Sequence, residues 1–333
     1  MEQLSIFDLT MPKVSVDKKI RLIELFAGVG SQAMALRDLG ADFEHYRVVE
    51  FDKYAIASYN AIHGTSFEPM DITKITGQQL EIIDKEKYCY ILTYSFPCQD
   101  LSAAGKGKGM KKGSGTRSGL LWEVERILKE TKELPDILIM ENVPQVIGWA
   151  NMPDFRKWQD FLTELGYINF VDILNAKDYG VAQNRERCFM VSLLGEYNYH
   201  FPRPIPLDKT IKDYLEDEVD EKYYINTEKA QKLIETLKNT DIETEGGRWS
   251  TERSIAHDNA ILQTASRPET GEYTRRNKPE TSYVKEVGYI EKGTGKHQSN
   301  VVYSTDGIAR CLQADGDSKN PLKVVVNESK TDR

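Results

Sequence analysis

The stretch RLIELFAGVGSQ, residues 21–32, has the pattern of a β-strand, a glycine turn and the first turn of a helix. The apolar run ends at Phe26, and Gly28 and Gly30 then allow the backbone to approach a ligand closely. Ser31 is placed to cap the helix that follows. Because any α/β protein can contain a two-glycine turn, this stretch indicates the fold class before it indicates a ligand.

Apolar runs and helical patterns alternate from Ile20 to about Leu194. Five further runs have the composition of strands: YRVVEF, YCYILTYSF, DILIMEN, INFVDIL and RCFMVSL. Among them, SQAMALRDLG and DFRKWQDFLTELG place apolar residues at helical spacing and end in glycine, and we interpret their aromatic residues as core. Alternation of this kind predicts an α/β fold with a doubly wound, mostly parallel sheet.

The chain divides by composition into three parts. Residues 1–19 form an N-terminal segment, and residues 20–200 contain the alternating pattern. After FPRPIPLD (201–208) the sequence becomes strongly charged, and then rich in glycine and short β-like runs. Residues 201–333 are therefore expected to form a second, smaller domain that contains strands.

Composition limits the class of protein. With 333 residues, 40% hydrophobic and 29% charged, the chain is expected to be soluble and globular, and no apolar run is as long as a membrane span. The first residues are too mixed in charge for a signal peptide, so a cytoplasmic location is expected. The four cysteines form no C-x-x-C pair and have no histidine at metal spacing, which argues against a disulfide framework or a metal site.

The net charge of −8 argues against a generally basic surface that binds nucleic acid. Residues 105–117, GKGKGMKKGSGTR, are nevertheless locally basic, since they carry five basic side chains and no acidic one. Taken alone, this stretch indicates either a solvated flexible loop or a patch that binds phosphates.

Acidic residues follow the glycine turn at the spacing of a nucleoside site. The second strand ends in Glu50-Phe51-Asp52, and an acid at that place typically binds ribose hydroxyls. Asp71 follows a third short segment, where it can accept a hydrogen bond from an adenine amino group. Since the turn departs from G-x-G-x-x-G, the set favours a cofactor with a single adenosine over a dinucleotide.

YSFPCQDLS, residues 94–102, places Cys98 at the carboxyl end of an apolar run, where open α/β sheets bind their ligands. A lone cysteine is most often an inert core residue. Here the preceding proline, the position at the strand end and the polar loop that follows favour a nucleophile. A thiolate near groups that stabilise negative charge is far more reactive than a thiol.

Two further motifs lie at strand ends. ILIMENVPQV ends a strand in Glu141-Asn142, and a partly buried carboxyl group there can hold or share a proton near neutral pH; the alternative is a structural salt bridge. VAQNRERCFMV places Arg185 and Arg187 just before the last strand, and alternation directs both to one side. The alternative for the arginines is an ordinary ion pair with Glu186 or a neighbouring carboxylate.

Taken in order, the glycine turn with an acid on the next strand, F-P-C-Q, E-N-V and Q-x-R-x-R resemble the cytosine-5 DNA methyltransferases over residues 20–200. The segment GYIEKGTGKHQSNVVYSTDGIARCLQADG is also similar to the target-recognition domain of those enzymes, in which a YS-x-x-GIA-x-x-L pattern recurs. The resemblance implies a Rossmann-like fold that binds S-adenosylmethionine, double-stranded DNA as the partner, and methyl transfer to C5 of a flipped-out cytosine.

The resemblance also implies roles for individual residues. Cys98 would attack C6 of the cytosine, and Glu141 would activate the base at N3. Arg187, with Arg185, would bind the carbonyl of the base. The basic loop 105–117 would close over the DNA and hold phosphates, with its glycines permitting the movement.

Asn142 and Pro97 would position the loop of the nucleophile. The residues of the cofactor site that the resemblance implies are Phe26, Ala27, Gly28, Val29, Gly30, Glu50, Phe51, Asp71, Ile72 and Pro97.

Several alternatives stay open at this point. A related branch of the family modifies transfer RNA with the same residues, although the long second domain favours DNA. A homologue that binds DNA or a partner without catalysis is a second alternative, against which the intact catalytic set argues. The target sequence is open, as is a role in a restriction-modification system, a phage or transcriptional regulation.

Family members usually continue past the recognition domain into a GNSV-type motif, whereas this sequence ends at KVVVNESKTDR. Three explanations are open: a natural truncation, a second polypeptide that supplies the final motifs, or a sequence that covers only part of the protein. The intact catalytic set favours the second polypeptide.

Overall fold

The computed structural model describes residues 12–101 and 108–218, and the backbone of four short strands between residues 286 and 325. Most of the pattern that resembles a target-recognition domain, at 288–316, lies outside the described residues, as do residues 105–107 of the basic loop.

The described residues divide into two compact units. The first unit contains the residues up to Leu174 together with Arg187–Pro202. The second contains Asn175–Glu186, residues 203–218 and the four short strands. The expected domain boundary at residues 200–201 stays a prediction, because the segment Asn175–Glu186 also groups with the second unit.

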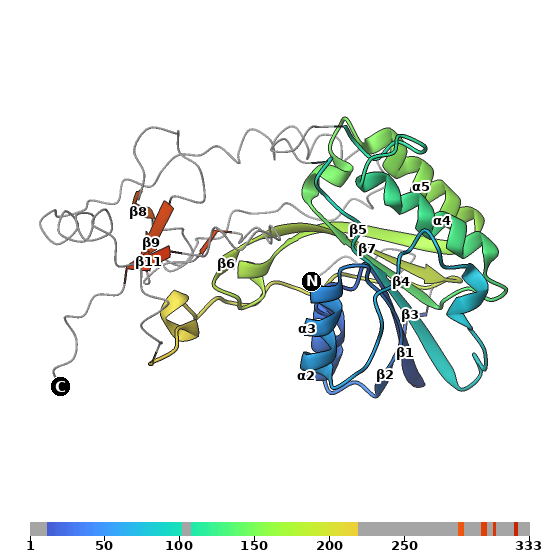
Figure 1. The fold of residues 1–333 in the computed structure, drawn as a ribbon, viewed down its shortest axis with the longest axis horizontal. Helices are drawn as coiled ribbons and strands as arrows, with labels where there is room; N and C mark the ends of the chain where they lie inside the picture. Colours follow the sequence, from blue (N-terminus) through green and yellow to red (C-terminus); the bar gives the residue numbers. More distant parts are fainter. Residues whose placement is uncertain are drawn as a thin grey trace, which may run out of the picture. The chain divides into compact units, whose positions relative to one another are not determined.

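The first unit is built on a six-stranded sheet (Figure 1). In spatial order its strands are β2 (Phe43–Val49), β1 (Lys19–Leu25), β3 (Tyr88–Tyr94), β4 (Ile137–Asn142), β7 (Glu186–Leu194) and β5 (Tyr167–Asn175). β1 is parallel to β2 and to β3, β3 is parallel to β4, and β7 is antiparallel to β4. The six predicted strands are confirmed, with bounds that differ by a few residues.

Helices cover both faces of this sheet (Figure 1). α2 (Ser31–Asp38) and α3 (Lys53–His63) pack on one face, and α4 (Leu121–Glu130) and α5 (Met152–Glu164) pack on the other. Successive residues of β1 show the two layers, since Leu22 packs in the cluster of Ala33 in α2 and Ile23 in the cluster of Trp158 in α5. The doubly wound α/β fold is thus confirmed. Short 3₁₀ helices are Gly77–Leu80, Ser118–Leu120, Pro144–Ile147, Ala176–Asp178 and Ile211–Tyr214.

The aromatic residues of α5 belong to the core, as the helical spacing predicts. Phe155, Trp158 and Leu162 are all buried against the sheet. The indole Nε1 of Trp158 donates a hydrogen bond to the hydroxyl of Tyr94 at 3.0 Å, so the polar atom of this large side chain is satisfied inside the core.

The path of the chain brings two loops to one edge of the sheet. From β1 the chain moves outward to β2 and then returns past β1 to β3, so the winding reverses between β1 and β3. In doubly wound sheets, ligands bind at the carboxyl ends of the strands at such a reversal. The glycine turn follows β1 and the loop of Cys98 follows β3, and these two strands are parallel neighbours.

The described part of the second unit contains short strands. β8 (Glu286–Tyr289), β9 (Val301–Ser304) and β11 (Lys323–Val325) form a sheet in the order β11-β9-β8. β10 (Ala309–Arg310) pairs with β6 (Gln183–Asn184). The expectation that the second part of the chain contains strands is confirmed.

Candidate active site

The glycine turn is held by hydrogen bonds to the end of β2, and there is free space next to its backbone at Gly28. Phe26 has φ +58°, a left-handed conformation that costs a non-glycine residue about 1–2 kcal/mol and is rare for a bulky side chain. The N–H of Ala27 donates to the carbonyl of Val49 at 3.2 Å, and the N–H of Gly28 donates to Glu50 Oε2 at 3.0 Å. A Cβ atom at Gly28 would meet nothing within 4 Å, so a ligand can approach the backbone there.

The expectation that Ser31 caps the following helix is wrong. α2 begins at Ser31, its N-cap residue is Gly30 with φ +80°, and no side chain caps it. The hydroxyl of Ser31 instead donates to Gln32 Oε1 at 3.0 Å. A helix N-terminus without a capping side chain next to an open turn is suited to a polar ligand group. Val29, between the two glycines, is 44% exposed.

Glu50 ties the glycine turn to α3. Its Oε2 accepts from Gly28, and its Oε1 accepts from the N–H of Asp52 at 2.9 Å. Asp52 in turn caps α3 by accepting from the N–H of Tyr54 at 2.7 Å. Each carboxylate oxygen has further acceptor capacity, so Glu50 remains able to bind a ribose hydroxyl.

Phe51 follows Glu50 and is 76% exposed, which presents an aromatic face to solvent. An exposed ring of this size is available for stacking on a base or for contact with a sulfonium group.

Asp71 lies in a loop, and the short segment before it is not a strand. Its Oδ1 accepts from the N–H and the hydroxyl of Thr73 at 3.0 and 2.8 Å, and Lys74 Nζ lies 3.9 Å from Oδ2. These hydrogen bonds, with Lys74, hold the pKa of the Asp71 carboxyl below its usual range. Asp71 is therefore a charged acceptor throughout the neutral range.

Neighbouring elements fix this loop at both sides. The N–H of Met70 donates to the carbonyl of Glu50 at 2.7 Å. The carbonyl of Ile72 accepts from Arg126 of α4 at 3.1 Å, and the Ile72 side chain is buried in the core. The loop of Asp71 is thus held between the β2 loop and α4.

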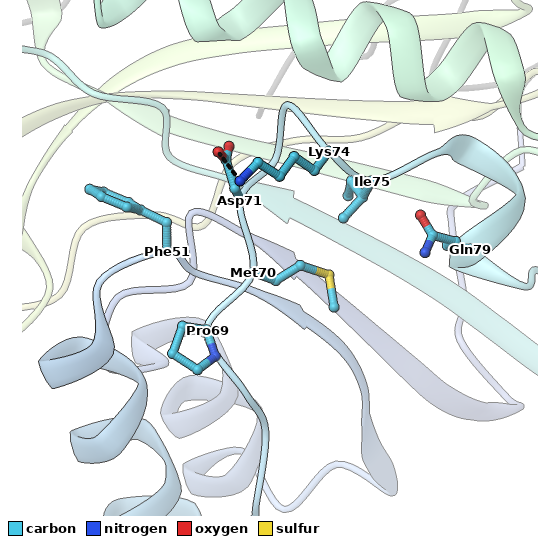
Figure 2. A pocket seen from close by; sticks show the side chains of 7 residues that line it. All are labelled: Phe51, Pro69, Met70, Asp71, Lys74, Ile75 and Gln79. Atoms are coloured by element: carbon cyan, nitrogen blue, oxygen red, sulfur yellow. Dashed lines mark ion pairs between the residues drawn. The ribbon is translucent and has the colours of Figure 1, made fainter.

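Phe51 and Asp71 line one open pocket of about 490 Å³ (Figure 2). The volume lies in the range of small-molecule sites, and an aromatic face beside a charged carboxylate suits an adenosine group. The residues present therefore fit the adenosyl part of the expected cofactor. The lining residues are Phe51, Pro69, Met70, Asp71, Lys74, Ile75 and Gln79.

Cys98 differs in its environment from the other described cysteines. Cys89 and Cys188 are buried in strands, and burial raises the pKa of the Cys89 thiol to about 11 and that of the Cys188 thiol further. Cys98 lies in the loop after β3 and is only partly buried. Among the described cysteines, it alone combines a loop position with solvent access.

Two side chains hold the backbone just before Cys98. Asn142, 3% exposed at the end of β4, donates to the carbonyl of Phe96 at 2.9 Å. The hydroxyl of Ser118 donates to the carbonyl of Pro97 at 2.6 Å. The contact of Asn142 agrees with the positioning role that the resemblance implies, whereas Ser118 was missed, because a single serine after a basic run carries no recognisable signal.

The described half of the basic loop is attached to the loop of Cys98. The carboxylate of Asp100 accepts from the N–H of Arg117 at 2.8 Å, and the Arg117 guanidinium donates to Gln99 at 3.1 Å. The N–H of Gly109 donates to the carbonyl of Asp100 at 2.9 Å, and Trp122 of α4 donates to the carbonyl of Met110 at 2.7 Å. Residues 108–117 are therefore held by hydrogen bonds to the loop of Cys98 and to α4, and the expected closing movement over DNA stays a prediction.

Glu141 and Arg187 face each other across β4 and β7. Arg187 Nε lies 3.0 Å from Glu141 Oε1, and the side chains are 17% and 25% exposed. The antiparallel register, in which Asn142 is opposite Cys188, brings the end of β4 and the start of β7 together. The neighbouring carboxylate that the sequence offered as an ion-pair partner for Arg187 is Glu141 itself.

Arg185 lies outside β7, which begins at Glu186, so the alternation argument does not extend to it. Its N–H donates to Asn175 Oδ1 at 3.0 Å, and its carbonyl accepts from the N–H of Ala176 at 3.0 Å. These residues belong to the second unit, and they fix the backbone of Arg185 within it.

Residues 12–101 and 108–218 contain no group of three or more His, Cys, Asp or Glu side chains that could hold a metal ion. Among the helices that the structure describes, none is long and apolar enough to cross a membrane.

Known proteins and a known family have sequences similar to that of this chain. The profile described as "C-5 cytosine-specific DNA methylase" matches residues 20–322. The orphan methyltransferase M.SssI of Spiroplasma monobiae is 36% identical over 275 residues, which are 66% of this chain and 71% of that protein. The type II methyltransferase M2.ScrFI of Lactococcus lactis subsp. cremoris is 35% identical over 254 residues, 62% of this chain and 70% of that protein.

Solved structures resemble the fold. The Schizosaccharomyces pombe (S. pombe) Dnmt2 methyltransferase has a TM-score of 0.51 at 22% identity and covers 65% of each chain. The Entamoeba histolytica methyltransferase EhMeth has a TM-score of 0.53 at 19% identity and covers 66% of this chain and 67% of that one. The expected second polypeptide has no support in these comparisons.

Proposed function

This chain belongs to the C-5 cytosine-specific DNA methylase family, and from this premise we propose that it transfers a methyl group from S-adenosylmethionine to C5 of a cytosine in double-stranded DNA through a covalent bond to Cys98. The observation that carries the proposal is the juxtaposition of Cys98 after β3, held by Asn142, with the Glu141–Arg187 pair between β4 and β7. A nucleophile and a group that can activate the base thus follow neighbouring parallel strands.

The cofactor side supplies binding and orientation. S-adenosylmethionine, when bound, supplies an electrophilic methyl group. Phe51 would stack on its adenine, Asp71 would accept from the adenine amino group, and Glu50 would accept from the ribose. The open backbone at Gly28 leaves room for the rest of the ligand.

The cytosine side supplies the covalent chemistry. The Cys98 thiolate forms a bond to C6, and the electron pair of the C5–C6 double bond moves so that C5 becomes nucleophilic and accepts the methyl group. C5 then loses its proton to a base, the C5–C6 double bond re-forms, and the bond from C6 to Cys98 breaks. Glu141 would carry a proton and donate it to N3, where negative charge develops as Cys98 adds to C6, and would take it back when the bond to Cys98 breaks.

Arg187 can serve Glu141 and the substrate together. A guanidinium carries five N–H donors in a fixed plane, so one edge can hold Glu141 Oε1 while another donates to the carbonyl of the cytosine. This ion pair also keeps the carboxyl group oriented before the base arrives.

A cytosine stacked in duplex DNA cannot reach a thiol in a loop at the edge of the sheet, so the base must leave the stack. Lys108 and Lys111 are exposed on the segment that is hydrogen-bonded to the loop of Cys98, and they lack a carboxylate partner in the described part of the chain. They would hold phosphates next to the flipped base.

The decisive experiment uses DNA that contains 5-fluorocytosine. Fluorine at C5 cannot leave as a proton, so the wild-type protein with S-adenosylmethionine should form a covalent adduct that resists denaturation. Cys98→Ala should form none, and the matched variant Cys89→Ala should form as much as wild type. An active wild-type enzyme that gives no adduct would overturn the covalent mechanism.

Labelled methyl transfer to DNA and to transfer RNA, run side by side, tests the substrate. Transfer to DNA is expected, and bisulfite sequencing of the product then identifies the target sequence. Transfer to RNA alone would replace the DNA proposal with the RNA alternative, and binding of DNA without any transfer would leave the non-catalytic one.

A further inference from the structure

A chain of polar side chains lies beneath the glycine turn, on the face of the sheet that α2 and α3 cover. It consists of Glu24 of β1, His45 of β2, and Tyr59 and His63 of α3. Glu24 and Tyr59 are 1% and 0% exposed. None of the four takes part in the chemistry proposed above.

The hydroxyl of Tyr59 connects the two strands. It lies 2.5 Å from Glu24 Oε2 and 2.6 Å from His45 Nδ1. A hydroxyl donates one hydrogen bond and accepts others, so two arrangements of protons satisfy the chain. With Glu24 ionised, His45 donates to Tyr59 and Tyr59 donates to Glu24. With Glu24 protonated, Glu24 donates to the hydroxyl of Tyr59, that hydroxyl donates to His45 Nδ1, and the negative charge of Glu24 is absent.

His63 connects this chain to the turn. Its Nε2–H donates to the carbonyl of Val29 at 3.1 Å, and its ring packs against Tyr59 with centroids 4.5 Å apart. A Cβ atom at Gly30 would overlap His63 Nε2 and would lie 2.5 Å from Tyr59 Cε2. The backbone of the turn therefore lies directly on the side chains of Tyr59 and His63, which occupy one face of α3 at i and i+4.

Glu24 is a costly residue for the interior of a sheet, because burial removes the water that stabilises its charge. Its Oε1 is buried and accepts no hydrogen bond of ordinary geometry within the described residues, although the N–H of Ala33 in α2 is close enough to favour the charged form. Burial raises the pKa of Glu24 to about 7, against the hydrogen bond from Tyr59. Burial and the nearby His63 lower the pKa of His45. The chain therefore changes its charge near neutral pH.

We propose that Glu24, Tyr59 and His63 are positioning residues for the glycine turn, and that the charge on Glu24 sets how strongly the turn prefers a cationic ligand to a neutral one. The inference rests on the proposed function, because it takes the turn to hold S-adenosylmethionine. That ligand carries a positive sulfonium, which its demethylated product S-adenosylhomocysteine lacks. A carboxylate beneath the turn attracts the first ligand more than the second.

The sign of the pH effect follows from the proton count. Raising the pH through the neutral range removes the proton of Glu24 and leaves a negative charge under the turn. The charge of Glu24 should therefore raise the affinity ratio of S-adenosylmethionine to S-adenosylhomocysteine as the pH rises. The sulfonium lowers the pKa of the α-amino group in S-adenosylmethionine alone, so the ligands add a pH dependence of their own, which the variant Glu24→Gln measures.

Calorimetry of the full chain with both ligands, at about pH 6 and about pH 8, measures this ratio on either side of the titration of Glu24. The charge of Glu24 should contribute about a threefold rise to the wild-type ratio, as expected for one charge acting through a partly polar medium. The ratio of Glu24→Gln should lack this contribution and so rise about threefold less than the wild-type ratio. The matched control is Tyr94→Phe, which removes a buried hydroxyl on the opposite face of the sheet and should keep the wild-type dependence.

His63 tests the positioning role at a partly exposed site. His63→Ala should weaken the binding of both ligands about fivefold, the effect of one lost hydrogen bond, and His63→Gln should restore it because an amide can donate to Val29. If Glu24→Gln keeps the wild-type pH dependence, or His63→Ala keeps the wild-type affinity, this inference is overturned and the proposed function is not affected. If wild type binds neither ligand, the proposed function is overturned with it.

Discussion

The two sides of the site are built on neighbouring strands but are held in different ways. On the side of β1 and β2, the carboxylate of Glu50 accepts from two backbone N–H groups, and Phe51 stands 76% exposed beside an open pocket. On the side of β3 and β4, Glu141 pairs with Arg187 and a buried Asn142 holds the backbone before Cys98. The first side is an open surface fixed through backbone, and the second is a set of half-buried side chains that fix one another.

This difference predicts two kinetic signatures. Contacts on an open face exist equally in the ground state and the transition state, so their loss should weaken binding and leave kcat unchanged. A half-buried charged group acts on charge that develops during the reaction, so its loss should lower kcat and leave ligand affinity unchanged. Substitutions on the two sides therefore test whether binding and catalysis are separated between them.

The largest effect is expected for Cys98→Ala. Removal of the nucleophile should lower the rate of methyl transfer at least about 10⁴-fold, while the dissociation constants for cofactor and DNA change little. Initial rates with labelled S-adenosylmethionine and gel-shift titrations measure the two quantities. Cys89→Ala, at a buried cysteine of β3, should keep the wild-type rate. Equal rates in the two variants would remove Cys98 from the chemistry.

The next effect is expected for Glu141→Gln. The amide keeps the shape of the side chain but has no proton to transfer to N3 and no charge that holds Arg187, so kcat should fall about 10³-fold. Calorimetry should give an unchanged affinity for S-adenosylmethionine.

Glu44→Gln is the control for the loss of an ion pair as such. Glu44 pairs with Arg21 at 2.5 Å in the same sheet, away from the carboxyl ends of the strands, and its loss should leave kcat unchanged. A loss of cofactor affinity in Glu141→Gln, with kcat retained, would place Glu141 on the other side of the site.

The sequence predicted the elements of the site better than their connections. Apolar runs identify every strand of the six-stranded sheet, because a strand that is buried on both faces is apolar along most of its length. The order of chemical residues along the chain then places Cys98 and Glu141 at strand ends. Which partner each polar group takes depends on register, and β7 runs antiparallel to β4, so the pair of Glu141 with Arg187 has no local signal.

Three differences show what local patterns leave out. Ser31 is of a residue type that is common at the N-cap. The helix, however, already begins at Ser31, so that Gly30 is the N-cap residue. Asp71 needs no strand before it, because Thr73 and one hydrogen bond from Arg126 of α4 hold its loop. Glu24 sits in an apolar run, where a single acid is easily passed over, and its partner Tyr59 is 35 residues away in the chain.

A smaller effect is expected for Phe51→Ala on the cofactor side. Loss of the exposed ring should weaken the affinity for S-adenosylmethionine about tenfold, because stacking and buried area are lost together, while kcat at saturating cofactor stays at the wild-type value. Tyr54→Ala is the matched control. It removes an aromatic ring that is 73% exposed on α3 but does not line the pocket, so it should bind cofactor as wild type does. A fall in kcat for Phe51→Ala would show that the two sides are not separable.

The smallest effect is expected at the rim of the β3 side, where two adjacent lysines have opposite surroundings. Lys112 lies 2.5 Å from Glu125 Oε2, a carboxylate that is 7% exposed, whereas Lys111 is exposed without an ion-pair partner in the described part of the chain. Lys111→Gln should weaken DNA binding about threefold and reduce the slope of log affinity against log salt by about 1, since one phosphate contact is lost. Lys112→Gln should change that slope less, because its ammonium group is held by the carboxylate of Glu125, which also pairs with Lys129. Fluorescence-anisotropy titrations at several salt concentrations measure both slopes. Equal reductions in slope would mean that the Lys112–Glu125 ion pair breaks when DNA binds, so that Lys112 contacts a phosphate as Lys111 does. The ion pairs on the β3 side would then hold the site only in the absence of DNA.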